Sequence, residues 1–298
     1  MQTIDSDTLN ARLAQNTAPI ILDILPDEHF ERSRLPNAFN ACVYEIEFLE
    51  KTAALCPDKS TEIVVYGLSD AYEASQLTYE KLSQSGWERV FVLVGGLEGW
   101  IANGLPTQGN GEAPSLQTGR FEANIEKSVV RWVGRNLLNQ HNGTIGLESA
   151  HLILENGNLV GGEATLDMNA IVCVDIEDSE MASMLIGHLR TDDFFLVDSY
   201  PTSHFSLSSV EAIENVNPGS PNCVIKGVFT LRGHSEPIEF IGTLGSDDAS
   251  IALQAQFDID RVLWNSKYGS GRIYEALGKH VVNDLISISF QLIAPAKS

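Results

Sequence analysis

Positive charge is scarce in this sequence. The 298 residues include 19 lysines and arginines against 40 aspartates and glutamates, which gives a net charge of −21 at pH 7. The first hundred residues and the remainder are both acidic, so the imbalance is not confined to one tail. A surface of this sign repels the phosphate backbone of nucleic acids and the anionic face of a membrane. Binding to nucleic acid or to an anionic membrane is therefore not expected.

Cysteines and long apolar runs are also scarce. The four cysteines, Cys42, Cys56, Cys173 and Cys223, form no C-x-x-C pair, so neither a zinc site nor a disulfide framework is predicted. No apolar run approaches the ~18 residues that a membrane-spanning helix needs. The first residues, MQTIDSDTLNARL, lack the basic and then apolar pattern of a secretory signal. We therefore expect a cytoplasmic protein with reduced thiols, no membrane span, no metal and no cofactor.

Strand and helix patterns alternate over the first hundred residues. The stretches APIILDI, EIVVY and VFVLVGG have the apolar, β-branched composition of buried strands. The stretches YEIEFLEKTAAL, DAYEASQLTYEKLSQSG and LEGWIANG have helical patterns. The first of these helices places Ile46, Leu49, Ala53 and Ala54 near one face, and Asp70 is a candidate N-cap of the second. This alternation predicts an α/β domain with a parallel sheet covered on both faces.

The pattern changes after residues 105–119, which are rich in proline and glycine and have no apolar periodicity. Asn156–Gly157 between two apolar segments predicts a hairpin. IALQAQFDI and LISISFQLI alternate apolar and polar residues, and about eight such segments fit between residues 120 and 294 around one helical stretch, DSEMASMLIGHLRTDDFF. An antiparallel barrel of about eight strands is either filled by side chains or holds one small ligand. We predict domains at 1–107 and 120–298, joined by a linker at 108–119.

The first domain resembles the rhodanese family. Leu22–Asp23 end an apolar strand, and Leu35–Pro36–Asn37–Ala38 stand where the family has a turn after the next helix. Gly95–Gly96 precede the helix that contains Trp100. The resemblance covers about residues 1–107. It implies a parallel-sheet fold and a sulfurtransferase activity that rests on a cysteine directly after the central strand. The backbone N–H groups of that loop lower the pKa of the thiol, which carries a persulfide.

In this sequence Gly67 stands at the nucleophile position. The basic residue that the family often has later in the loop falls near Tyr72, and Asp70 adds negative charge. Without a thiolate there is no nucleophile, and Cys56, the nearest cysteine in sequence, is expected to serve in packing. The loop amides can still form an anion-binding concavity that Asp70 would partly occupy or oppose.

The second domain resembles the YceI-like family over about residues 120–294. The matching features are a leucine-rich helix, a run of Asp and Phe, a Tyr-Pro pair and a following Phe strand, at Leu185–Leu189, Asp193–Phe195, Tyr200–Pro201 and Phe205. The resemblance implies a lipocalin-like barrel that binds a long apolar molecule, such as an isoprenoid or a fatty acyl chain. It does not imply catalysis.

Aromatic residues near strand ends and around the helix are the candidate ligand contacts, although each can equally well belong to the core. They are Trp132, Phe194, Phe195, Tyr200, Phe205, Phe257, Trp264 and Tyr268. A polar set lies in the same segments, namely His188, Arg190, Asp192 and His204. These four residues have three interpretations: a hydrogen-bonded cluster that ties the helix to the barrel, which we favour, a head-group site, or a metal site built from His188, Asp192 and His204.

Our main hypothesis is a non-enzymatic carrier or sensor of an apolar ligand, in which the rhodanese-like domain is a docking or regulatory module for a protein partner. Two alternatives stay open. One is a sulfurtransferase-related enzyme that uses a thiol other than the missing loop cysteine. The other is a purely structural interaction protein with a filled barrel.

Overall fold

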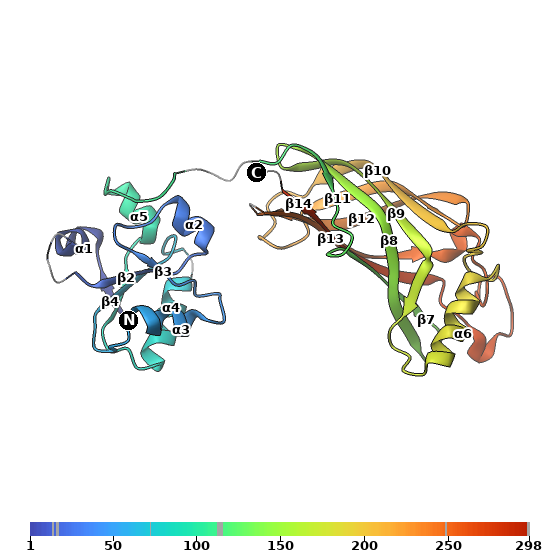
Figure 1. Cartoon of the computed structure of the whole chain (residues 1–298), viewed down its shortest axis with the longest axis horizontal. Coiled ribbons are helices and arrows are strands. Elements are labelled where there is room, and N and C mark those ends of the chain that lie inside the picture. The colour runs from blue at the N-terminus through green and yellow to red at the C-terminus, as the bar shows by residue number, and fades with distance from the viewer. Residues whose placement is uncertain (14, 16–17, 72, 112–115, 248, 297–298) are drawn as a thin grey trace. The chain divides into compact units, whose positions relative to one another are not determined.

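The computed structural model describes residues 1–298 except residues 14, 16, 17, 72, 112–115, 248, 297 and 298. The chain divides into two compact units, residues 1–113 and 114–298 (Figure 1). Part of the predicted linker, residues 112–115, lies outside the described residues. Residues 108–111 hydrogen-bond to the first unit, since Gln108 pairs with Arg34 and the N–H of Asn110 donates to the carbonyl of Glu31.

The first unit alternates strands and helices, as the sequence predicts. Its elements are β1 (Gln2–Ile4), α1 (Ser6–Leu13), β2 (Ile20–Asp23), α2 (Asp27–Arg32), β3 (Phe39–Asn40), α3 (Phe48–Leu55), β4 (Ile63–Tyr66), α4 (Ala74–Gln84), β5 (Val90–Leu93) and α5 (Gly96–Ala102). The strands form one parallel sheet in the order β1-β5-β4-β2-β3. All four residues of the central strand β4 are buried, because the sheet has an apolar core on each face. The α/β prediction is confirmed.

The apolar face that the sequence suggests for α3 is not the face that the helix buries. Ile46 is 98% exposed, and Leu49, Ala53 and Ala54 are exposed too. The helix begins at Phe48, after a turn, and buries Phe48 and Thr52. Phe48 packs into the apolar core on one face of the sheet. Burial of its ring removes more apolar surface from water than burial of the small alanines would.

The second unit consists of long antiparallel strands and one helix. Its elements are β6 (Gly119–Glu122), β7 (Val129–Arg135), β8 (Gln140–Glu155), β9 (Asn158–Cys173), α6 (Ser179–Arg190), β10 (Thr202–Ala212), β11 (Cys223–Leu231), β12 (His234–Ser246), β13 (Ser250–Asp260), the 3₁₀ turns η1 (Arg261–Trp264) and η2 (Gly278–His280), and β14 (Leu285–Pro295). Strands β7 to β14 close into a barrel, because β8 pairs with both β7 and β9. The short strand β6 pairs with the far part of β8. The barrel prediction is confirmed.

Local sequence signals determine where two elements of the barrel unit begin and turn. The β8–β9 hairpin turns at Asn156 and Gly157, with φ angles of 50° and 77°, as a type I′ turn requires. Helix α6 begins after Asp178, whose carboxylate accepts hydrogen bonds from the N–H groups of Glu180 and Met181. Its side chains Leu185, Ile186 and Leu189 then pack against the barrel core. Within the described part of the chain, no helix is long and apolar enough to cross a bilayer.

Candidate ligand-binding site

The barrel encloses a cavity of about 420 Å³. This volume lies within the roughly 300–1,000 Å³ that is usual for sites that enclose a small organic ligand. The alternating residues of β13 and β14 reach it from one side, and α6 covers it through Leu185 and Leu189. Most of its lining is aliphatic or aromatic. The alternation that predicts the strands therefore also builds an apolar interior.

Six of the eight predicted aromatic contacts line this cavity. They are Trp132, Phe194, Phe195, Phe205, Phe257 and Tyr268. Phe205 fits because Gly227 has no side chain: a Cβ there would lie 2.4 Å from the Phe205 ring. Substitution of Gly227 would push this ring from its place over β11.

Tyr200 and Trp264 lie away from the cavity lining. Trp264 is fully buried, donates a hydrogen bond from Nε1 to the carbonyl of Phe229 at 2.9 Å, and packs edge-on against the Phe229 ring. The ring of Tyr200 lies beside Gly233, whose Cβ would come within 2.5 Å of it. Both aromatic residues fix neighbouring strands and turns in the structure.

Sequence reasoning missed three aromatic residues of the cavity, Phe229, Phe240 and Phe290. The rings of Phe240 and Phe257 are stacked, with centroids 4.2 Å apart, and Phe290 packs edge-on against Phe240 at 5.8 Å. Phe290 was recognisable as an inward position in LISISFQLI. Phe240 occurs in a stretch with no clear alternation, so only its partners in the folded barrel identify it.

The exposed and partly exposed members of the lining gather mostly at one end. Asn136 comes from the β7–β8 turn, Tyr268 and Lys279 come from the segment 265–284, and His188 comes from α6. The segment lies beside α6 (Figure 1), and His188 packs edge-on against Tyr268 where the two meet. This end is therefore the mouth of the cavity.

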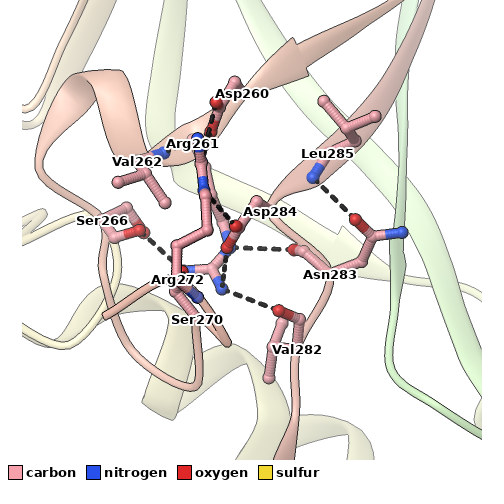
Figure 2. Close-up of polar contacts among 10 residues, drawn as sticks. All are labelled: Asp260, Arg261, Val262, Ser266, Ser270, Arg272, Val282, Asn283, Asp284 and Leu285. Atoms are coloured by element: carbon pink, nitrogen blue, oxygen red, sulfur yellow. Dashed lines mark hydrogen bonds and ion pairs between the residues drawn. The ribbon is translucent and has the colours of Figure 1, made fainter. Parts of the chain in front are cut away.

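A buried arginine organises the segment beside the mouth. Arg261 has no exposed surface, and its guanidinium donates hydrogen bonds to the carbonyls of Ser266, Val282 and Asn283 at 2.6, 3.1 and 3.0 Å (Figure 2). Burial lowers the pKa of Arg261, and the nearby charge of Asp284 opposes that shift. The guanidinium thus ties both ends of the segment 265–284 to η1.

The four polar candidates do not form one cluster. His188 bonds to Asp193 at 2.9 Å, Arg190 donates to Asn169 on β9 at 2.7 Å, and His204 contacts Thr165 at 3.2 Å. Asp192 is exposed. Among the described residues no group of three or more His, Cys, Asp and Glu side chains is placed to hold a metal. Only His188 of this set lines the cavity.

In the first unit, Gly67 follows β4 at the carboxyl end of the sheet. A Cβ at this position would lie 3.2 Å from the hydroxyl oxygen of Ser75. Asp70 is not the N-cap of α4, which begins after Glu73. The Asp70 carboxylate instead accepts a hydrogen bond from the N–H of Gly95 at 2.8 Å, so a protein carboxylate takes one of the amides beside the loop. Tyr72 lies outside the described residues.

Cys56 lies at the opposite end of the sheet, where β4 begins. It ends α3 before β4 begins, and its carbonyl accepts the indole N–H of Trp87, just ahead of β5. Gly67 lies beyond the far end of β4, a strand length of ~13 Å at 3.3 Å per residue. The Cys56 thiol is buried and contacts the carbonyl of Asp58. This thiol therefore cannot reach the loop.

Asp23 is a buried carboxylate near the loop. It ends β2 directly beside Tyr66 in the sheet register, and its Oδ1 accepts the N–H of Leu25 at 2.9 Å. Burial raises its pKa to about 6, although the hydrogen bonds from Tyr66 and Leu25 and the charge of Arg34 favour the ionised form.

Comparison with known proteins identifies both units. A sequence profile of the YceI-like domain matches residues 121–294, and one of the rhodanese-like domain matches residues 5–103. A sulfurtransferase of Allochromatium vinosum is 29% identical over 103 residues, which are 35% of this chain and 91% of that protein. BcnA of Burkholderia cenocepacia is 21% identical with a TM-score of 0.46, over 58% of this chain and 99% of that structure. A polyisoprenoid binding domain of Saccharophagus degradans is 11% identical with a TM-score of 0.43, over 59% and 98%.

Proposed function

The chain belongs to the YceI-like family, whose profile covers more than half of it, and from that premise we propose that its barrel binds, carries or senses one long apolar ligand of the isoprenoid or fatty acyl type. The observation that carries the proposal is the cavity of about 420 Å³ with its largely apolar lining. A filled barrel would have no such space, so the cavity argues against a purely structural barrel.

The proposed binding depends on shape and apolar area. Each Å² of apolar surface that the ligand buries contributes about 25 cal/mol before ordering costs are subtracted. The stacked Phe240 and Phe257 rings and the aliphatic side chains opposite them can contact a hydrocarbon chain along its length. No charged cluster is needed, which fits the dispersed positions of Arg190, Asp192 and His204.

We propose that the rhodanese-like domain serves as a docking or regulatory module for a protein partner and does not turn over sulfur. Three observations support the absence of sulfur turnover. The nucleophile position is Gly67, the Asp70 carboxylate accepts a hydrogen bond from the N–H of Gly95, and the Cys56 thiol lies at the opposite end of β4.

The test is native mass spectrometry of the full chain, followed by solvent extraction and titration of the extracted protein with a fluorescent polyene fatty acid. We expect a co-purified lipid or saturable binding of the probe. Ala164→Phe places a ring in the cavity and should weaken probe binding about tenfold, or about 1.4 kcal/mol. Ala252→Phe is the matched control, because Ala252 is half-buried on β13 but does not line the cavity. An empty barrel that also refuses the probe would overturn the proposal.

A further inference from the structure

Exposed apolar side chains surround the mouth of the cavity. Leu138 at the β7–β8 turn is 78% exposed, Met184 on α6 is 69% exposed, and Tyr274 in the segment 265–284 is 49% exposed. Each has an exposed apolar neighbour. We call this set the mouth face, and it consists of Leu137, Leu138, Met181, Met184, Ile273 and Tyr274. Exposed apolar residues that occur singly need no explanation, but a group around one opening indicates a contact surface.

Contacts between the three elements hold this face together. Asn136 of the β7–β8 turn pairs with Val282 at the end of the segment 265–284. Tyr268 of that segment packs against His188, which lies one helical turn after Met184 on α6. Arg261 fixes the segment from below through the carbonyls of Ser266 and Val282. The exposed side chains therefore stand on an ordered frame.

The charges around the mouth face are of both signs. The segment 265–284 exposes Lys267 and Lys279 along with the acidic Glu275, whereas α6 begins with the acidic residues Asp178 and Glu180. Arg272 of the segment is already paired with two carboxylates. The segment holds three lysines and arginines against two acidic residues, whereas the whole chain has a net charge of −21. A zwitterionic phospholipid head group offers one phosphate and one ammonium group, so it can satisfy both sets. An anionic bilayer would be repelled by the chain as a whole.

We propose that the mouth face docks on the surface of a neutral phospholipid bilayer, so that the cavity opens toward the acyl chains. Leucine, methionine and tyrosine side chains suit this interface, because the apolar part enters the lipid while the tyrosine hydroxyl stays hydrated. A second copy of the chain fits less well, since two strongly acidic molecules repel each other. Docking does not depend on what the cavity holds, whereas its use for loading a ligand rests on the proposed function.

The experiment is flotation of the full chain with phosphatidylcholine vesicles. We expect the chain to float with the vesicles, and the double variant Ile273→Asp/Tyr274→Asp to bind them about tenfold more weakly, because two carboxylates cannot enter the lipid without a large desolvation cost. Ile125→Asp is the matched control. Ile125 is as exposed as Tyr274, at 49%, but its turn bonds to Ile293 at the other end of β14.

A second pair of substitutions keeps the proposal testable if the double variant does not fold, as judged by circular dichroism. Leu137→Ser/Leu138→Ser changes only the β7–β8 turn and should also weaken flotation. Absence of flotation for the unmodified chain, or equal loss in Ile125→Asp, would overturn the proposal. A dimer in sedimentation velocity that Ile273→Asp/Tyr274→Asp dissociates would overturn it in favour of self-association. Titration of the fatty acid probe without vesicles tests the cavity separately, so the two failures are distinguishable.

Discussion

The imidazole of His188 packs edge-on against the ring of Tyr268, with centroids 4.8 Å apart and planes at 82°. Phe194 touches both rings, at 5.0 Å from His188 and 5.3 Å from Tyr268. The three residues come from α6, from the loop after it and from the segment 265–284, and all three line the cavity. Together they form the side-chain boundary between the cavity and its mouth.

Removal of one ring should open this boundary. Tyr268→Ala deletes two aromatic contacts, each worth about 0.5–1.5 kcal/mol, so the bound fatty acid probe should dissociate about tenfold faster. Stopped-flow displacement measures the rate constant. Tyr200→Ala is the control, because Tyr200 is aromatic and similarly exposed but does not line the cavity. An unchanged rate in Tyr268→Ala would contradict the gating role of this ring.

Arg261 should be much more important for stability than its neighbour Arg272. Arg261→Met leaves the carbonyls of Ser266, Val282 and Asn283 without their donor, and because the guanidinium itself is fully buried the change should cost about 3–5 kcal/mol. Arg272 is half-exposed and bonds to Asp260 and Asp284 (Figure 2), so Arg272→Met should cost much less, because water screens an exposed ion pair. Hydrogen exchange of peptides from 265–284 and thermal unfolding would measure both. Similar losses in the two variants would refute this difference.

The stability of the first unit should fall as the pH rises from about 4 to about 6. The Asp23 carboxyl has a pKa of about 6 in the folded chain, because it is buried, against about 3.9 when unfolded. Between these values the folded state holds a proton that the unfolded state has lost, so stabilisation present at low pH disappears. Asp23→Asn keeps an acceptor for Leu25 and should flatten this decline, in hydrogen exchange of β2 and β4. A decline of equal size in the variant would assign it to another group.

Sulfur transfer should be absent from the native chain and hard to restore. The unmodified protein should show no thiosulfate:cyanide turnover. Gly67→Cys alone is crowded by Ser75, so Gly67→Cys/Ser75→Ala is the better variant. We expect only weak turnover from it, since Asp70 holds the Gly95 N–H and its charge disfavours a thiolate. Native turnover that Cys56→Ser abolishes would show that our assignment is wrong.

The fold was largely predictable, because its signals are local. The alternation in β13 and β14 and the Asn156–Gly157 turn depend on residues close in sequence. The errors occurred where distant contacts decide. Phe48 outcompetes Ile46 for the core, and Asp70 caps no helix because the Gly95 N–H lies within its reach.

The candidate site was predictable in part for the same reason. Aromatic residues could be placed on inward positions, but the empty volume between them depends on how strands far apart in sequence face each other. Arg261 was not singled out, because a lone arginine after a strand is usually exposed. Two of its three carbonyl partners, Val282 and Asn283, come from the far end of the segment 265–284 and are distant from Arg261 in sequence.

The seam of the barrel has a consequence for synthesis. Strand β7 pairs with β14, so that Val130 lies opposite Phe290. On the ribosome, β7 can pair with β8 early but must wait for almost the whole domain to emerge before its second partner, β14, exists. The last strand of the first unit, β5, ends at Leu93. Domains generally fold as units in order of emergence, and contacts distant in sequence form slowly. The rhodanese-like unit is thus complete while the barrel is still an open sheet with a free edge, and the barrel can enclose a ligand only after its final strand has been translated.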